Sequence, residues 1–353
     1  MRCAMSEVYR TFAPARVNLI GEHIDYNGGT VLPAALSIGI SVELTPREDE
    51  TVTIRSAQHD EAVSRSLSDI FSDHWADPAL GAVIEASRLD LLRGGADVSI
   101  GSTMPAGSGL SSSAALMVAI LKAAREAAGS GPDDVQLAVA ARRVENEFLG
   151  VPCGIMDQMA VALATPGKAM ALQTETLDWQ ILDLIPGYSM AVIHSGITRK
   201  LTDGQYASRK VECDHAKEYF RTDDLCHLDP AAIQAADLPE NVKRRALHCV
   251  GENARVLAAM EALRSKDAQS FGSLMNESHV SMRDLFEISL PPIDALVKDA
   301  VAFGAEGARL TGGGFGGCLV ACVADERLEE WQDRLLTEHE SAYAIASVAV
   351  PTQ

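Results

Sequence analysis

The stretch Pro105-Ala106-Gly107-Ser108-Gly109-Leu110-Ser111-Ser112-Ser113-Ala114-Ala115 places two glycines and three serines directly before a predicted helix. Glycine lets a backbone approach a ligand closely, and the free N–H groups and dipole of a helix N-terminus attract phosphate. A serine hydroxyl at this point could also bind Mg²⁺, a cation that prefers oxygen ligands. The stretch therefore predicts a phosphate-binding loop, although a flexible loop with an ordinary serine cap would have the same composition.

A helix is expected immediately after this loop. Ala114, Met117 and Val118 begin an apolar repeat with the 3.6-residue period of a helix, and the repeat continues to about residue 128. The serines at 111–113 stand where a helix N-terminus takes a capping oxygen. The loop is not a Walker loop, because GxxxxGK[ST] is absent, and the chain is not a protein kinase, because HRD and DFG are absent.

The composition is that of a globular chain with a strong negative charge. The length of 353 residues suggests about two domains, and the 47% share of hydrophobic residues argues against disorder. The formal charge of −19 argues against nucleic acid or an anionic membrane as the main partner, because both are bound through basic patches. Any anionic substrate must therefore be held by local donors. We expect small molecules as partners and a monomer, although the charge does not determine the oligomeric state.

The cysteines and the apolar runs indicate where the protein is found. The seven cysteines are scattered, odd in number and without a CxxC pair, which favours free thiols over disulfides or a zinc site. No apolar run approaches the ~18 residues that span a bilayer, and no apolar signal core follows Met1–Met5. We expect a cytoplasmic protein.

Strand-like and helical segments alternate along the chain. In the first half we expect strands at 17–20, 29–32, 38–42 and 51–54, and helices at 79–93, at 133–149 and from about 154. In the second half we expect a strand at 187–194, helices at 199–220, 241–264, 266–285, 292–304 and 325–338, and a last strand at 343–350. This order indicates α+β layers with a domain boundary near residue 185.

The stretch Arg16-Val17-Asn18-Leu19-Ile20-Gly21-Glu22-His23-Ile24-Asp25-Tyr26-Asn27-Gly28-Gly29 crowds polar groups of both signs into a strand and the turn after it. Carboxylates, an imidazole and an amide can bond several hydroxyls at once, so a polyol such as a sugar fits. Two alternatives remain open. Glu22, His23 and Asp25 could bind a metal, although neighbours on a strand point to opposite faces, or the segment could be a solvated turn.

Two further motifs carry polar or flexible residues in apolar surroundings. Asp157 lies in an apolar segment, where it must be paired or hold its proton, and a cation such as Arg16 would keep it ionised and able to accept a proton. A capping or salt-bridged Asp is the alternative. The stretch Gly312–Gly317 matches GxGxxG, but a strand follows it, whereas a dinucleotide site requires a helix there. We therefore favour a glycine turn that lies against the phosphate loop or the substrate. A purely structural hairpin is the alternative that remains open.

The order and spacing of these motifs resemble the GHMP small-molecule kinase superfamily, and within it the galactokinases. Residues 13–33 resemble the galactokinase signature, 105–115 the ATP loop of the superfamily, and 307–318 its third motif. The resemblance covers nearly the whole chain. It implies a two-domain α+β GHMP kinase fold, with a ribosomal-S5-domain-2-like domain at 1–185, ferredoxin-like layers at 186–353 and the active site between them.

The resemblance also implies a role for individual residues. Backbone amides of the loop would hold the phosphates of ATP, with Asp157 and Arg16 as catalytic residues, and Mg²⁺ would bind to Ser113 and Glu145. The loop residues are Gly107, Ser108, Gly109, Leu110, Ser111, Ser112 and Ser113. The sugar would be contacted by Glu22, His23, Ile24, Asp25, Gly154 and Tyr206. Whether Asp157 is a true base or orients the hydroxyl is left open by the sequence.

The expected activity is transfer of the γ-phosphate of MgATP to the C1 hydroxyl of D-galactose. A kinase for galacturonate, arabinose or N-acetylgalactosamine is the alternative within the class, and a sensor that binds galactose and ATP without turnover is the alternative outside it. The chain departs from the family at Ala15, where glycine is usual. It departs again after Trp75, where Ala79 and Leu80 replace an expected aromatic residue, so the adenine pocket is not assigned.

Overall fold

The structure is a computed structural model that describes residues 7–105, 107–198 and 204–349. It divides into two compact units that alternate along the chain. The first unit comprises Met1–Ala15, Ser37–Met104 and Ser111–Leu163, and the second comprises Arg16–Leu36, Pro105–Leu110 and Ala164–Gln353. The sequence analysis predicted two uninterrupted domains with a boundary near residue 185, and that boundary stays a prediction.

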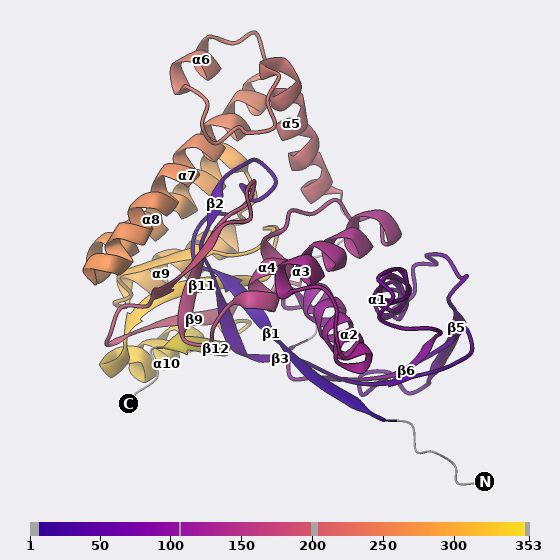
Figure 1. Cartoon of the computed structure of the whole chain (residues 1–353). Helices are drawn as coiled ribbons and strands as arrows, with labels where there is room; N and C mark the ends of the chain where they lie inside the picture. Colours follow the sequence, from indigo (N-terminus) through magenta and orange to yellow (C-terminus); the bar gives the residue numbers. More distant parts are fainter. Residues whose placement is uncertain (1–6, 106, 199–203, 350–353) are drawn as a thin grey trace, which may run out of the picture. The chain divides into compact units, whose positions relative to one another are not determined.

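The first unit combines a sheet with a group of helices. Strand β3 (Pro33–Pro46) pairs antiparallel with β6 (Ala96–Ser102), which pairs parallel with β4 (Thr51–Ser56), and β4 pairs antiparallel with β5 (Val63–Ser66). The helices are α1 (Asp77–Arg88), α2 (Ser112–Ala128), α3 (Asp134–Arg143) and α4 (Met156–Leu163), and they lie together in Figure 1. Met117, Val118 and Leu121 of α2 are fully buried, as their spacing predicted.

The second unit is built on a four-stranded antiparallel sheet in the order β10-β11-β9-β12. Its strands are β9 (Tyr188–His194), β10 (Gly307–Leu310), β11 (Cys318–Ala324) and β12 (Tyr343–Ala349). Helix α10 (Leu328–Glu338) connects β11 to β12, and β9 lies between these two strands. Strand β11, helix α10 and strand β12 therefore form a split β-α-β unit, with the antiparallel strand β9 inserted.

The other elements of the second unit are two short strand pairings and further helices. Strand β7 (Lys168–Gln173) pairs antiparallel with β2 (Thr30–Val31) and with β8 (Trp179–Asp183). Helices α7 (Glu240–Ser265) and α8 (Ala268–Ser281) run side by side in Figure 1. The remaining helices are α5 (Gln205–Phe220), α6 (Pro230–Ala235) and α9 (Pro291–Ala302). Strand β1 (Tyr9–Asn18) and β3 each run from one unit into the other.

The helices differ from the sequence prediction mainly at their ends. Helix α1 ends at Arg88 instead of residue 93, and the helices predicted to end at 149 and 285 finish as π-helical turns at Val144–Phe148 and Met282–Phe286. The short helix α6 was missed. The predicted start of α5 at residue 199 lies outside the described residues.

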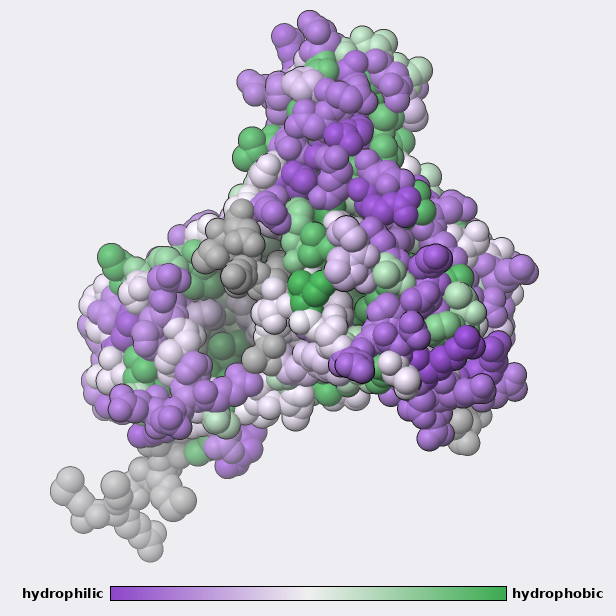
Figure 2. Space-filling model, turned by 180° about the vertical axis from the view of Figure 1, so that it is seen from behind, coloured by the Kyte–Doolittle hydropathy of each residue, from purple (hydrophilic) through white to green (hydrophobic). Residues whose placement is uncertain are grey.

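The surface is mainly polar on the face shown in Figure 2, with hydrophobic residues in small groups. Phe12 and Val211 are exposed apolar side chains, and Ile70 and Phe71 are an adjacent exposed pair; such scattered exposure is normal on protein surfaces. Among the described residues, no helix combines the length and the apolar character that crossing a membrane requires.

Candidate active site

The loop at residues 107–110 is fixed through its carbonyl oxygens. Arg16 donates from its Nη1 to the carbonyl of Gly109 at 3.3 Å and from its backbone N–H to that of Leu110 at 3.4 Å. The thiol of Cys318 donates to the carbonyl of Ser108 at 3.2 Å. Three successive carbonyls of the predicted phosphate loop are therefore bonded by other segments of the second unit.

The third glycine-rich motif lies against this loop, as the sequence predicted. A Cβ atom on Gly312 would lie 3.5 Å from the carbonyl oxygen of Gly109, and one on Gly317 would lie 3.6 Å from that of Ser108. Both glycines have φ near +80°, a conformation that residues with a side chain rarely adopt. The motif therefore supports the loop by close backbone packing.

Helix α2 begins directly after the loop, but its first serine does not cap it. Ser111 occupies the N-cap position with φ of 64° and makes no side-chain cap hydrogen bond. Its hydroxyl donates instead to Oδ2 of Asp157, in the first turn of α4. The prediction of ordinary serine capping is wrong at Ser111, because a tertiary contact uses the oxygen that the cap requires.

Glu145 lies beside these groups in the π-helical turn after α3. Its carboxylate accepts hydrogen bonds from the Ser113 hydroxyl and from Nε2 of Gln158, the latter at 2.6 Å. Burial raises the pKa of Glu145 to about 7, and the negative charge of Asp157 adds to the rise. The first unit thus brings Ser111, Ser113, Glu145 and Asp157 into one cluster, from segments that lie 46 residues apart in the chain.

The donor set of this cluster fits Mg²⁺. Ser113 and Glu145 offer a hydroxyl and a carboxylate oxygen, and Mg²⁺ commonly takes one or two carboxylates together with phosphate oxygens and water. In the part of the chain that the structure describes, no three His, Cys, Asp or Glu side chains form a group that could hold a metal. This finding also removes support from the alternative metal site at Glu22, His23 and Asp25.

The carboxylate of Glu22 is buried and bonded on both oxygens. One oxygen accepts from the backbone N–H of Gly312 at 2.6 Å and from the hydroxyl of Thr311 at 3.1 Å. The other accepts from Asn18 at 2.6 Å and from Nη2 of Arg309 at 2.5 Å. Glu22 therefore anchors the third glycine motif, and its predicted contact with a sugar hydroxyl stays a prediction.

Arg309 is a buried cation beside the predicted sugar segment that the sequence analysis did not single out. Its side chain is fully buried in β10 and lies 3.7 Å from Glu252 of α7 as well as bonding Glu22. Glu252 in turn accepts from the backbone N–H of Gly21 at 3.0 Å and from the Ser278 hydroxyl at 2.6 Å. These contacts connect Gly21 and Glu22, in the predicted sugar segment, to helices α7 and α8 and to strand β10.

Aromatic rings surround His23 in the predicted sugar segment. Nδ1 of His23 lies 2.7 Å from the hydroxyl of Tyr26, and its ring centroid lies 5.2 Å from that of Tyr206 and 4.6 Å from that of Phe286. The structure therefore brings His23 and Tyr206 together from distant segments, and their predicted contacts with a sugar stay predictions. Ile24 is fully buried, and its carbonyl accepts from the N–H groups of Asn27 at 3.1 Å and Gly29 at 2.9 Å, so its predicted contact with a sugar stays a prediction.

Two predicted relations are not tested by these contacts. The pairing of Arg16 with Asp157 stays a prediction, and so do the sugar contacts of Asp25 and Gly154. Gly154 is buried just ahead of α4, and Asp25 is half-buried in the turn after β1.

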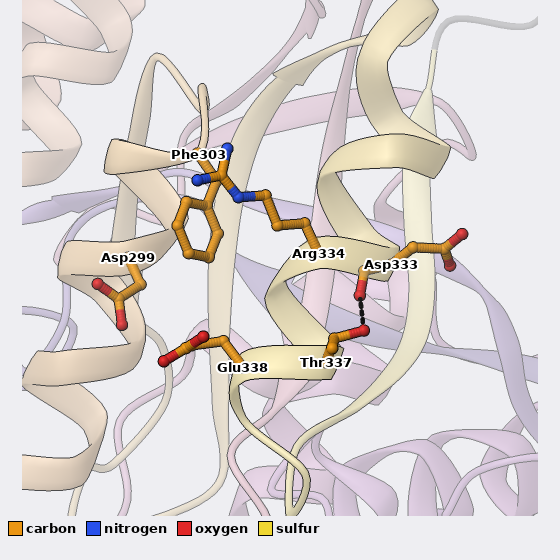
Figure 3. Close-up of a pocket in the computed structure, with 6 residues that line it drawn as sticks. All are labelled: Asp299, Phe303, Asp333, Arg334, Thr337 and Glu338. Carbon is orange, nitrogen blue, oxygen red and sulfur yellow. Dashed lines mark hydrogen bonds between the residues drawn. The ribbon is translucent and has the colours of Figure 1, made fainter.

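A cavity of about 520 Å³ lies elsewhere, between α9 and α10. Figure 3 shows Arg334 stacked over the ring of Phe303, with Cζ 3.9 Å from the ring centroid, and three acidic residues around them. None of the predicted site residues lines this cavity, so we do not assign the active site to it.

Family models match three parts of the chain. The model for the GHMP kinases N terminal domain matches residues 78–165, and the model for the GHMP kinases C terminal region matches residues 259–339. The two-domain α+β fold is therefore that of the GHMP kinases, as the sequence predicted. A third model, the galactokinase galactose-binding signature, matches residues 5–46.

Comparison with individual proteins shows which family of GHMP kinases the chain resembles. The galactokinase of Actinobacillus pleuropneumoniae serotype 3 (strain JL03) is 39% identical over 351 residues, 96% of this chain and 91% of the relative. That of Glaesserella parasuis serovar 5 (strain SH0165) is 39% identical over 330 residues, 90% of this chain and 86% of the relative. The chain belongs to the galactokinase family, so it is a kinase, and the family implies ATP as a co-substrate.

Solved structures agree with this assignment. The crystal structure of Lactococcus lactis galactokinase complexed with galactose matches with a TM-score of 0.91 at 28% identity, over 98% of this chain and 95% of that one. The mevalonate kinase of Methanococcus jannaschii matches with a TM-score of 0.72 at 18% identity, over 99% of this chain and all of the other. The second match shows the fold alone.

Proposed function

We propose that this enzyme transfers the γ-phosphate of MgATP to the C1 hydroxyl of D-galactose and forms galactose 1-phosphate. The observation that carries the proposal is the cluster of Ser111, Ser113, Glu145 and Asp157 at the N-terminus of α2. Phosphoryl transfer depends mainly on positioning and electrostatic stabilisation, and this cluster supplies a helix dipole and two carboxylates. The galactokinase relatives support galactose as the acceptor.

The loop at Gly107–Ser113 is proposed to bind the phosphates of ATP through its backbone amides. Its carbonyls are held by Arg16 and Cys318, which keeps the loop in one conformation before the nucleotide arrives. Ser113 and Glu145 would hold Mg²⁺, which when bound neutralises charge on the phosphate oxygens. The raised pKa of Glu145 agrees with a carboxylate whose desolvation a cation would offset.

Asp157 is proposed to receive the proton of the C1 hydroxyl, or to orient that hydroxyl, while Arg16 stabilises the developing charge. Asp157 stands in the first turn of α4, half-buried and hydrogen-bonded to Ser111. A carboxylate in this setting is ready to accept a proton without a large rearrangement.

The sugar is proposed to bind at the turn after β1. His23, Tyr26 and Tyr206 already form a cluster of rings and polar groups there, and such groups can contact both faces and hydroxyls of a hexose. The proposed contacts are Glu22, His23, Ile24, Asp25, Gly154 and Tyr206. Glu22 would act here mainly by holding the turn in place.

The proposal is tested by measuring ADP release from MgATP across a panel of hexoses, pentoses and uronic acids. We expect galactose to give the highest kcat/KM. Faster turnover with galacturonate, arabinose or N-acetylgalactosamine would keep the reaction class and replace the substrate. Binding of galactose and ATP without turnover would identify a sensor instead.

We further propose that the enzyme works as a cytoplasmic monomer. The acidic surface and the six free cysteines of the described residues are compatible with a reducing compartment. Sedimentation at micromolar concentration should give a single species near 37.6 kDa.

A further inference from the structure

Ser111 has a backbone conformation that is unusual for its residue type. Its φ of 64° and ψ of 43° lie in the left-handed region, which the neighbouring Gly107 and Gly109 also occupy in φ. Glycine adopts such values without cost, whereas a residue with a Cβ is strained there. Strain of this kind persists where the surrounding structure requires it, and it concentrates at functional sites.

The side chain of Ser111 does not cap its own helix. Serine at an N-cap usually accepts a hydrogen bond from the second or third N–H of the helix, and Ser111 makes no such bond. Its carbonyl still accepts from the N–H of Ala115 at 3.0 Å, so the helix begins normally at this residue. Only the hydroxyl departs from the usual capping pattern, because it donates to the carboxylate of Asp157 instead.

The neighbouring carboxylate is held in a similar way. The Ser113 hydroxyl bonds Glu145, so two serines from the start of α2 each hold one carboxylate of the cluster. The charge of Asp157 is one cause of the raised pKa of Glu145, so the two carboxylates interact unfavourably when both are ionised. A donor on each carboxylate offsets that repulsion and fixes its orientation.

We propose that Ser111 is a positioning residue for phosphoryl transfer, whose left-handed backbone brings its hydroxyl to Oδ2 of Asp157 and holds that carboxylate in its reactive orientation. The proposal rests on the proposed function, because it assigns Asp157 to the reaction. It assigns to the Ser111 side chain a task separate from phosphate binding, which the loop performs through backbone amides. It also explains why serine stands at a position where the backbone alone favours glycine.

The test compares Ser111→Gly with Ser111→Ala. Both variants lose the hydroxyl, but glycine relieves the backbone strain and alanine keeps it. We expect kcat with galactose to fall roughly 10- to 100-fold in both variants, since small misplacements of a reacting group cost this much. KM for ATP and the Kd for galactose should stay within about threefold of the wild-type values, because the amides and the sugar turn are unchanged.

A matched control separates the hydroxyl from the backbone. Asp90 is an exposed residue of the first unit with φ of 57°, outside the candidate site. Asp90→Gly therefore makes the same left-handed-to-glycine change, and its kcat should equal that of the wild type. Thermal unfolding of each variant checks that it is folded, and the melting temperature of Ser111→Gly should be no lower than that of the wild type.

The outcomes distinguish this inference from the proposed function. Wild-type kcat in Ser111→Gly, with reduced kcat in Ser111→Ala alone, would show that backbone strain matters and the hydroxyl does not, which overturns the inference. Wild-type kcat in both variants overturns it as well. A wild-type enzyme that phosphorylates no sugar would refute the proposed function instead.

Discussion

Two groups of carboxylates in this molecule are built in opposite ways. In the first unit, Glu145 and Asp157 are like charges that are half-buried and held by serine hydroxyls. In the second unit, Glu22 and Glu252 are almost fully buried around the Arg309 guanidinium. Glu145 and Asp157 are partly exposed, so a substrate could contact them. Glu22 and Glu252 are buried, and their ion pairs with Arg309 join distant segments of the chain.

The pKa values differ between Glu145 and Glu252, whereas burial keeps the pKa of Glu22 raised even beside Arg309. Burial and then the charge of Asp157 raise the pKa of Glu145 to about 7. Burial also acts to raise the pKa of Glu252, but Arg309, His248 and Arg255 outweigh it and lower that pKa to about 2. Glu252 is therefore ionised within a buried ion cluster, whereas the raised pKa of Glu145 makes it a candidate for binding or catalysis.

The largest expected effect is on turnover, from Asp157→Asn. An amide of equal size keeps an acceptor for Ser111 but cannot take a proton at neutral pH, so kcat should fall roughly 100- to 10,000-fold. The unfolding midpoint and the Kd for galactose should remain near the wild-type values. Rapid-quench measurement of phosphosugar gives kcat, and a variant that stays within threefold of wild type would remove Asp157 from the reaction.

A large loss of stability is expected from Arg309→Met, which leaves Glu22 and Glu252 without their shared cation. Removing one partner of a buried ion pair costs about 3 to 5 kcal/mol of unfolding free energy. Urea unfolding measures the loss, and adding Glu22→Leu to the same chain should recover part of it. Arg10→Met, at an exposed ion pair with Glu43, is the matched control and should change stability little.

A smaller effect is expected when the pH falls below neutral. Burial lowers the pKa of His248 to about 4, so between pH 6.5 and 4 the unfolded chain binds a proton at this residue that the folded chain does not. The free energy of unfolding should therefore decrease as the pH falls through this window, by about 3 kcal/mol for this residue. His279 has a similarly lowered pKa and acts in the same direction.

Substitution isolates the contribution of His248. Its Nε2 donates to the carbonyl of Glu22 at 3.1 Å, and a glutamine can place an amide N–H in the same region. The slope of unfolding free energy against pH should be clearly shallower in His248→Gln than in the wild type. An unchanged slope from urea titrations at several pH values would contradict the assignment.

The smallest expected effect concerns the metal. Glu145→Gln keeps the size of the side chain but removes the charge, so the Mg²⁺ concentration for half-maximal activity should rise at least roughly tenfold. Turnover of Glu145→Gln should be reduced at low Mg²⁺ concentration, and saturating Mg²⁺ should restore much of it. A variant with an unaltered Mg²⁺ dependence would show that Glu145 is not a ligand.

The sequence predicted those features that depend on local pattern. The start of a helix after the glycine and serine loop and the buried face of α2 follow from residue types at short spacing. The contact of Gly312 with the loop is long-range, and the sequence favours it because the glycine-rich motif does not fit a dinucleotide site. Helix α6 also had a local signal that we overlooked, since Asp229 caps it and Pro230 begins it.

The features that the sequence could not predict depend on long-range contacts. Ser111 and Asp157 are 46 residues apart, and nothing local shows that the serine turns from its helix toward a carboxylate. Arg309 is 287 residues from Glu22, and a single arginine in a short strand is usually exposed. The alternation of the two units along the chain has no local signal either, and its first two crossings fall inside strands β1 and β3.

The account rests on phosphorylation of galactose at its anomeric carbon, and NMR of the product tests this most directly. Incubation of the protein with MgATP and galactose should give one phosphosugar, whose phosphorus couples to the proton on C1, together with an equal amount of ADP. A product phosphorylated on another hydroxyl, or ATP that remains intact beside unmodified galactose, would contradict the account.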